Sequence, residues 1–255
     1  MRSLPALVLA ACALLAAPVL RAQGPPLKAG EAFATLDANG KLQTWGDAQM
    51  PRPLGGLAKV VWLRLCGPDW ASLDVYWDCR NPGCQPPKGH GKVNLAKAFR
   101  LDCDDAFLYW ANWERKDWVE QQGEGISRMQ LMAVFGPFTG PRVPKDGPLP
   151  DFTPDWMGRG DLLQASPQAF LAWLADPENQ PVLTQVREML KGFFASAADS
   201  RTWWFKPAAC SQGTWVLAGD GQSAAVLFIA MPELPQDAVR RMQELLGLAK
   251  NAKKK

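Results

Sequence analysis

Residues 53–62 read Pro-Leu-Gly-Gly-Leu-Ala-Lys-Val-Val-Trp, and this stretch decides the fold prediction. The apolar positions from Leu54 to Leu65 predict a helix that begins directly after the proline. Gly56 and Lys59 are three positions apart, so they share one face of that helix. Glycine offers no reactive atom at its position, whereas Lys59 offers an amine.

Strand patterns occupy both ends of the chain. The segment from Glu31 to Trp45 alternates loosely around Asn39-Gly40, which is typical of a two-residue hairpin turn. An amphipathic helix, Pro235–Ala249, is predicted near the other end. The segments predicted as strands before it are Thr202–Phe205, Thr214–Ala218 and Ala224–Met231.

Helix patterns fill the middle of the chain. Asn94 is a suitable cap for a helix with apolar positions from Leu95 to Ala106. Ser166-Pro167 opens a second helix, with serine as the cap and proline at the first helical position. A third helix is predicted at Val182–Phe194. The segments rich in glycine and proline, predicted as irregular, are residues 67–92 and 136–160.

This order of elements predicts an α+β fold. The strands at the two ends are expected to share one antiparallel sheet flanked by helices, with a helical subdomain inserted between them. The sheet part covers about residues 30–65 and 200–250, and the helical part covers about 66–199. We expect residues 23–255 to form a single domain.

The first 22 residues are typical of a secretory signal peptide, with Arg2 followed by an apolar run and cleavage near Ala22. We therefore expect export to the periplasm or cell envelope. Leu9-Ala10-Ala11-Cys12 also matches a lipoprotein cleavage box, so lipid anchoring at Cys12 is an alternative to a soluble form. No later segment has the roughly 18 continuous apolar residues of a membrane-spanning helix.

The formal net charge falls from +3 to +1 when residues 1–22 are removed, because they contain two arginines and no acid. This balance gives no basis for nucleic-acid binding. Five cysteines remain, and Cys79 and Cys84 bracket a turn-forming Arg-Asn-Pro-Gly, which favours a disulfide between them in an oxidising compartment. Their spacing also fits half of a zinc site, but no second ligand pair follows at a useful spacing, so no metal is expected.

Four segments together carry a resemblance to a known family: Gly56-Leu57-Ala58-Lys59; Asp102-Cys103-Asp104, which follows Gly89-His90-Gly91; Lys206-Pro207-Ala208; and the run from Trp156 into the Ser166 helix. In this order they resemble the motifs of the serine penicillin-recognising enzymes, most closely class D β-lactamases and penicillin-binding transpeptidases. The resemblance implies the β-lactamase/transpeptidase-like fold over roughly residues 30–247.

The family has three motifs: Ser-x-x-Lys, then Ser-x-Asn or Ser-x-Val, and finally Lys-Thr-Gly. This chain departs from each of them. Gly56 replaces the serine nucleophile, Asp102 and Asp104 replace Ser and Asn, and Pro207-Ala208 replaces Thr-Gly. An aspartate beside Lys59 would raise the pKa of that lysine and keep it cationic, and Asp104 is expected to hold Lys206 in the same way. The resemblance therefore implies a site that has lost acylation.

The resulting hypothesis is an exported, non-acylating homologue that binds a peptidoglycan-type peptide or an envelope protein partner, without a cofactor. The residues expected to line its pocket are Lys59, Asp102, Asp104, Trp156 and Lys206. One alternative is an active transpeptidase, carboxypeptidase or β-lactamase that uses Ser72 or Ser211. A second alternative is an interaction scaffold with no ligand pocket.

Overall fold

The computed structural model describes residues 24–65, 76–84, 88–138, 145–160, 163–190, 196–197 and 202–248. The predictions for the signal peptide, its cleavage site, Cys12 and Ser72 concern residues outside these ranges.

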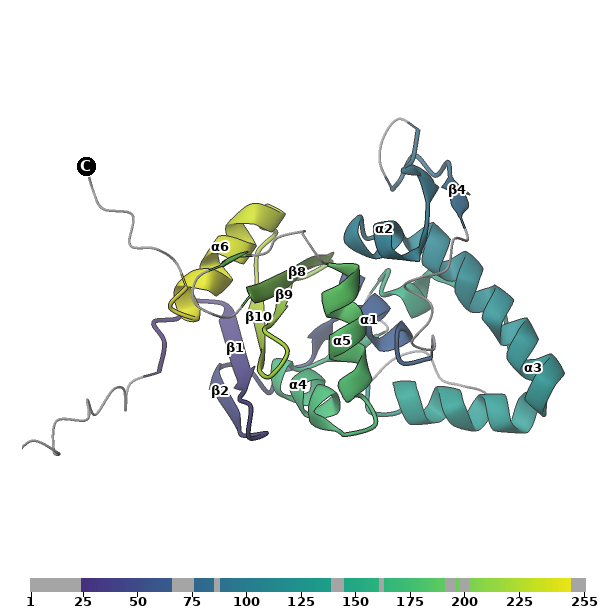
Figure 1. Ribbon diagram of the computed structural model, residues 1–255, viewed down its shortest axis with the longest axis horizontal. Helices are drawn as coiled ribbons and strands as arrows, with labels where there is room; N and C mark the ends of the chain where they lie inside the picture. Colours follow the sequence, from purple (N-terminus) through teal and green to yellow (C-terminus); the bar gives the residue numbers. More distant parts are fainter. Residues whose placement is uncertain are drawn as a thin grey trace, which may run out of the picture.

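The centre of the molecule is an antiparallel sheet with the strand order β2-β1-β10-β9-β8-β7 (Figure 1). β1 pairs with both β2 and β10, so the sheet joins the two ends of the described chain as predicted. The strands are β1 (Glu31–Leu36), β2 (Leu42–Gly46), β7 (Ser196–Ala197), β8 (Thr202–Cys210), β9 (Gly213–Gly219) and β10 (Ala224–Ile229).

Helices cover both faces of this sheet (Figure 1). α6 (Pro235–Leu245) packs on one face, and α4 (Pro167–Ala175) packs on the other. Every residue of β9 and β10 is buried. Side chains alternate along β9, so that Trp215 enters the core on the α4 side and Val216 enters the core on the α6 side. Burial on both faces explains the continuous apolar runs of these strands.

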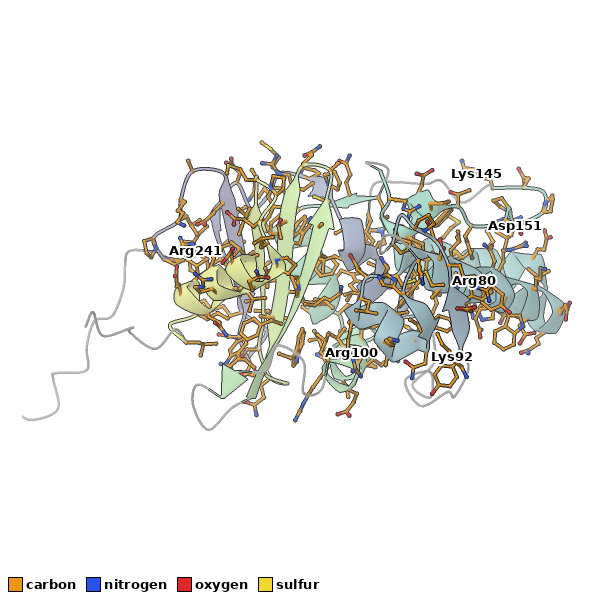
Figure 2. The ribbon with its side chains drawn as sticks, turned by 90° about the horizontal axis from the view of Figure 1, so that it is seen from above. Arg80, Lys92, Arg100, Lys145, Asp151 and Arg241 are labelled. Carbon is orange, nitrogen blue, oxygen red and sulfur yellow. The ribbon has the colours of Figure 1, made fainter. Side chains whose placement is uncertain are left out.

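An ion pair attaches α6 to the first strand. Arg241 Nε lies 2.8 Å from Glu31 Oε1, and both side chains are largely buried. Burial raises the pKa of the Glu31 carboxyl, but the Arg241 hydrogen bond and charge lower it, and the net direction is downward. Figure 2 shows Arg241 at the sheet end of the molecule, whereas Arg80 and Lys92 lie at the helical end.

The helical part contains α1 (Ala58–Trp62), which continues from a short 3-10 turn η1 (Gly55–Leu57), and then α2 (Leu95–Arg100), α3 (Asp104–Phe135) and α5 (Gln180–Met189). α3 is two helices joined at Gly123, whose φ of 80° lies outside the helical region. Figure 1 shows the two halves of α3 folding back on each other away from the sheet. Within the described ranges, no helix is long and apolar enough to cross a membrane.

The first segment predicted as irregular, residues 67–92, contains β4 (Trp77–Cys79) and leads into β5 (Gly91–Val93), with which β4 pairs. A second short pair, β3 (Arg52–Pro53) with β6 (Gln164–Ala165), lies outside the segments predicted as irregular. A 3-10 turn, η3 (Pro154–Met157), follows α3 along the chain. These elements are two to four residues long, too short for a periodic sequence pattern to reveal.

The helix predicted after Asn94 forms but ends earlier than expected. The Asn94 side chain accepts a hydrogen bond from the Lys97 N–H at 2.9 Å and caps α2, as predicted. The helix stops at Arg100, because Asp102 has a φ of 58°. A new helix, α3, begins at Asp104 with Cys103 as its N-cap residue. Asp102 and Cys103 therefore lie in the turn between two helices, and Asp104 opens the second helix.

Candidate functional site

Lys59 lies on α1 with its side chain fully buried. Its Nζ is 2.5 Å from Asp104 Oδ1 and 3.1 Å from Asp102 Oδ1. Asp102 lies in the turn between α2 and α3, and Asp104 is the first residue of α3. This segment places both carboxylates next to Lys59 of α1, and Asp102 also lies beside Gly56 of η1. The structure thus brings these predicted site residues together.

Lys206 reaches the same turn from the sheet. Its neighbours Trp204 and Ala208 belong to the core on the helical side, and alternation along β8 directs Lys206 to that side. Lys206 Nζ lies 3.1 Å from Asp102 Oδ1, and its side chain is only 2% exposed. Asp102 is therefore shared by two buried lysines.

The prediction that Asp104 pairs with Lys206 is wrong, because Lys206 pairs with Asp102. Asp104 pairs instead with Lys59 and with Arg159, whose Nε lies 2.9 Å from Asp104 Oδ2. The geometry of the turn is the reason: Asp102 points toward both lysines, whereas Asp104 points toward Lys59 of α1 and toward Arg159, which follows η3. We call the five residues Lys59, Asp102, Asp104, Arg159 and Lys206 the charged cluster.

The cluster sets the protonation of its members. Burial lowers the pKa of Lys59, but the charges of Asp102 and Asp104 raise it, and the net direction is upward. Burial raises the pKa of Asp102, but Lys206 and Lys59 lower it to about 2. A lysine held as a cation cannot accept a proton from a nucleophile. Lys59 therefore acts as a counterion here, as the sequence predicted.

The carboxylate of Asp102 fills the space in which a side chain at position 56 would lie. A Cβ atom on Gly56 would overlap that carboxylate. The backbone at Gly56 is not in the left-handed region, so its conformation alone would permit another residue. Gly55 differs, because its φ is 52° and a Cβ there would overlap the Ala209 carbonyl. Glycine is thus needed at position 55 because of the backbone conformation and the nearby carbonyl, whereas at position 56 it is needed because the Asp102 carboxylate occupies the space.

The turn that carries Asp102 is conformationally unusual. Asp102 is the one non-glycine residue with a positive φ among the residues that the structure describes. Aspartate is among the few residues that tolerate this conformation, which still costs free energy. The ion pairs to Lys59 and Lys206 offset that cost and hold the turn in place.

Trp156, the fifth predicted pocket residue, lies in the core. Its side chain is buried, its ring packs edge-on against Phe135 and Phe152, and its carbonyl accepts a 2.7 Å hydrogen bond from Trp62 Nε1. The hydrogen bond joins Trp156 to Trp62, the last residue of α1. In this arrangement the Trp156 ring presents no open face to a ligand.

The predicted disulfide between Cys79 and Cys84 is not formed, because both residues are free thiols in the structure. The ligand atoms of Cys79, Cys84, His90 and Cys103 instead lie within 4.8 Å of one another. The sequence argument looked for a second pair of ligands at a short spacing. It missed this set, because His90 precedes β5 whereas Cys103 is the N-cap residue of α3. We call these four residues the Cys/His cluster.

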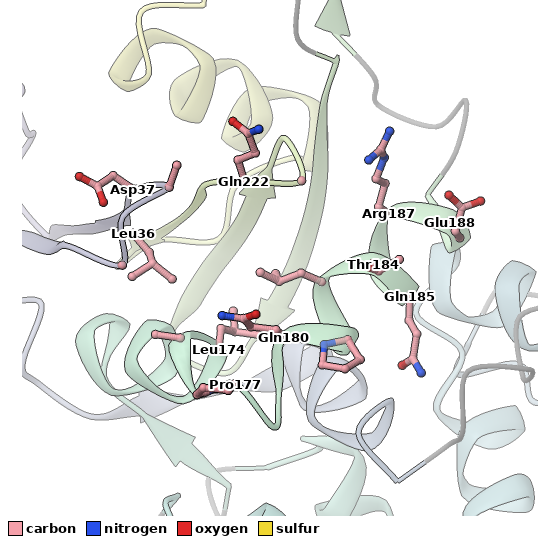
Figure 3. A pocket seen from close by; sticks show the side chains of 16 residues that line it. Leu36, Asp37, Leu174, Pro177, Gln180, Thr184, Gln185, Arg187, Glu188 and Gln222 are labelled. Atoms are coloured by element: carbon pink, nitrogen blue, oxygen red, sulfur yellow. The ribbon is translucent and has the colours of Figure 1, made fainter.

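A cavity of about 750 Å3 lies elsewhere on the molecule. It is bounded by the β1–β2 turn, the α4–α5 connection and the β9–β10 turn, and Figure 3 shows Asp37, Gln222 and Arg187 around it. No member of the charged cluster lines it. No sequence motif pointed to this cavity.

No family model matches this sequence, and curated protein sequences give no match either. Solved structures do match. A class D β-lactamase from Bacillus subtilis is 15% identical, with a TM-score of 0.55, over 87% of this chain and 93% of its own. The class D β-lactamase FUS-1 from Fusobacterium nucleatum subsp. polymorphum is 12% identical, with a TM-score of 0.53, over 86% of this chain and 93% of its own.

The penicillin-binding protein PBP2 from Helicobacter pylori is 14% identical, with a TM-score of 0.51; the match covers 86% of this chain and 60% of that one. The fold is therefore that of the serine penicillin-recognising enzymes. Within that class the matches named here include class D β-lactamases, the branch that the sequence motifs resemble most closely. At this identity the likeness establishes the fold alone.

Proposed function

We propose that this protein is an exported, non-acylating homologue of penicillin-binding transpeptidases and class D β-lactamases. It acts in the cell envelope by binding a peptidoglycan-type peptide or a protein partner. The observation that carries the proposal is the position of the Asp102 carboxylate, which fills the space beside Gly56 and pairs with both lysines.

Acylation by a serine enzyme requires a nucleophile and a base that can take its proton. Position 56 offers no oxygen, and Lys59 is held as a cation by two carboxylates. Ser211, in the turn between β8 and β9, has threonine rather than lysine three positions later. Asp102 thus has two effects. It helps to keep Lys59 cationic, so that Lys59 cannot serve as a base, and it fills the space that a nucleophile at position 56 would need.

The exposure of the cluster limits what a ligand can contact. The Arg159 side chain is 44% exposed and that of Asp102 is 32% exposed, whereas Lys59 is fully buried. A ligand therefore meets the guanidinium and the outer edges of the carboxylates, and the lysines serve to hold those carboxylates in place. The burial of both lysines also favours a second candidate, an interaction scaffold with no ligand pocket at these residues.

Labelling with a β-lactam, read by intact mass, tests the loss of acylation. The mature protein and the Gly56→Ser variant are expected to gain no mass, because Asp102 obstructs the new side chain and Lys59 stays cationic. A rebuilt variant, with Gly56→Ser, Asp102→Ser, Asp104→Asn, Pro207→Thr and Ala208→Gly, restores the family motifs and is the positive comparison. A covalent adduct on the unmodified protein would overturn the proposal.

Binding is tested separately from acylation. A soluble muropeptide that raises the melting temperature of the protein, but raises that of Arg159→Ala less, supports recognition at the charged cluster. Asp47→Asn is the matched control, because Asp47 is exposed on the loop after β2 and lies outside the cluster. Indifference of all three proteins to the muropeptide favours the scaffold candidate.

A further inference from the structure

The Cys/His cluster gathers donor atoms from three separate places in the fold. Cys79 ends β4, His90 directly precedes β5, and Cys84 lies in the turn that follows β4. Cys103 comes from the N-cap of α3. His90 is the only histidine in the chain, so its arrival beside three cysteines is a specific arrangement.

The spacing of the donor atoms suits a metal ion. In a tetrahedral zinc site with Zn–S distances of about 2.3 Å, neighbouring sulfur atoms are about 3.8 Å apart. All four donor atoms here lie within 4.8 Å of one another, so movements of less than about 1 Å would close them around an ion. A disulfide would require two sulfur atoms at about 2.05 Å and would leave the other two donors unused.

His90 provides an independent observation. Its Nδ1 atom is buried and has no hydrogen-bond partner among the residues that the structure describes. Buried polar atoms in proteins are almost always hydrogen-bonded, and an exception requires a reason. Nitrogen of a neutral imidazole is a good zinc ligand, and coordination would satisfy such an atom.

The backbone around His90 is built for close approach. Gly89 has a φ of 75°, and a Cβ atom there would overlap the Cys79 carbonyl and the Asn81 backbone nitrogen. Glycine at this position lets the segment that leads from His90 into β5 lie against the end of β4, whose Cys79 is paired with Gly91. Gly89 thus allows the close approach that brings His90 beside Cys79.

The β4–β5 hairpin also needs an anchor. Each strand has three residues, and a two-stranded hairpin of this size is not stable by itself. Asn81 Nδ2 donates a 2.9 Å hydrogen bond to Asp105 Oδ1 and ties the hairpin to α3. A metal that joins Cys79, Cys84 and His90 to Cys103 would fasten the hairpin to the same helix end.

We propose that Cys79, Cys84, His90 and Cys103 bind one zinc ion in a closed, structural Cys3His site. Three sulfur ligands and one nitrogen in tetrahedral arrangement select zinc over the harder divalent cations, which prefer oxygen. Four protein ligands leave no open position for a substrate, so the ion stabilises the fold and performs no reaction. The proposal replaces the expectation that the chain holds no metal, and it does not depend on the proposed function.

Metal content of the full mature chain tests the site. The protein, purified with reductant and dialysed after exposure to zinc, is expected to retain about one zinc ion per chain. Cys84→Ser and His90→Ala change half-buried ligands and are expected to lose most of that metal. Cys210→Ser is the matched control, because Cys210 is also half-buried but lies outside the cluster, and it should retain the zinc.

Two further measurements keep the test decisive if a variant folds poorly. Cobalt substitution of the unmodified protein should give the visible absorption of a tetrahedral site with thiolate ligands, and that absorption should disappear when zinc is added. Zinc removal by a chelator should lower the melting temperature, and added zinc should restore it.

Three outcomes would overturn the zinc site: no retained zinc, equal zinc in Cys84→Ser and Cys210→Ser, or a Cys79–Cys84 disulfide in a reductant-free preparation that takes up no metal. Stoichiometric retention of a different metal would overturn the choice of zinc.

Discussion

The charged cluster and the Cys/His cluster occupy two sides of one turn, yet they are opposite in character. In the charged cluster the buried lysines are neutralised by Asp102 and Asp104, which are themselves held at fixed positions. In the Cys/His cluster four donor atoms converge and the Nδ1 atom of His90 has no partner in the described structure.

Cys103 connects the two clusters, because it lies between Asp102 and Asp104. One side of the turn therefore carries carboxylates that pair with buried lysines, and the other side contributes a donor atom. This difference shows that a single short segment can be constrained from two sides: by ion pairs on one side and, in our proposal, by a metal on the other.

Asp102→Asn is expected to have the largest effect on the charged cluster. Asparagine keeps the size of the side chain and tolerates the positive φ, so the substitution removes mainly the charge. Loss of one partner from a buried ion pair costs roughly 3 kcal/mol in unfolding free energy, because Lys59 and Lys206 lose a shared counterion. Urea unfolding measures this, with Asp47→Asn as the control.

The same variant tests whether the two clusters are separable. Asp102 contributes no donor atom to the Cys/His cluster, so the folded Asp102→Asn protein should retain as much zinc as the unmodified protein. Loss of both stability and zinc would mean that the clusters form one cooperative unit, and the comparison drawn above would not hold.

Gly56→Ser is expected to have the next largest effect. The new side chain would overlap the Asp102 carboxylate, and such overpacking costs about 1–3 kcal/mol. Asp102→Ser in the same chain removes the obstruction, so the double variant should be more stable than the sum of the single effects predicts. Additive unfolding free energies would show that Asp102 does not fill the space beside position 56.

Asn94→Ala should have a smaller effect on the free energy of unfolding. Asn94 caps α2, which leads into the turn that carries residues of both clusters. Loss of such a cap costs about 1 kcal/mol, so the free energy of unfolding should fall by that amount. Asn94→Asp is the matched variant, since aspartate also caps helices, and it should be close to the unmodified protein in urea unfolding.

Arg159→Ala is expected to have the smallest effect on stability. Its guanidinium is 44% exposed, and ion pairs of this kind contribute about 0.5 kcal/mol or less. Asp104 keeps its buried partner Lys59 in the variant. A loss as large as that of Asp102→Asn would show that Arg159, rather than the buried lysines, holds the turn.

The sequence by itself determined the fold class and four members of the charged cluster, Lys59, Asp102, Asp104 and Lys206; the fifth, Arg159, was found only in the structure. Periodic apolar strands at both ends, the caps Asn94 and Ser166, and the segments around Lys59 and Lys206 are local patterns that the structure confirms. The cationic state of Lys59 was also predicted from the sequence, because the resemblance placed Asp102 beside Lys59.

Only the tertiary structure decided which groups meet. The exchange of partners at Asp104, the burial of Trp156 and the gathering of Cys79, Cys84, His90 and Cys103 all depend on where the turn after α2 and the β4–β5 hairpin lie in space. Cys103 lies 13 positions after His90, and Arg159 lies 55 positions after Asp104, so no local pattern links either pair. The positive φ of Asp102 was not predicted either. Short-range periodicity carries secondary structure, whereas contacts between distant segments are set by the packing of the whole chain.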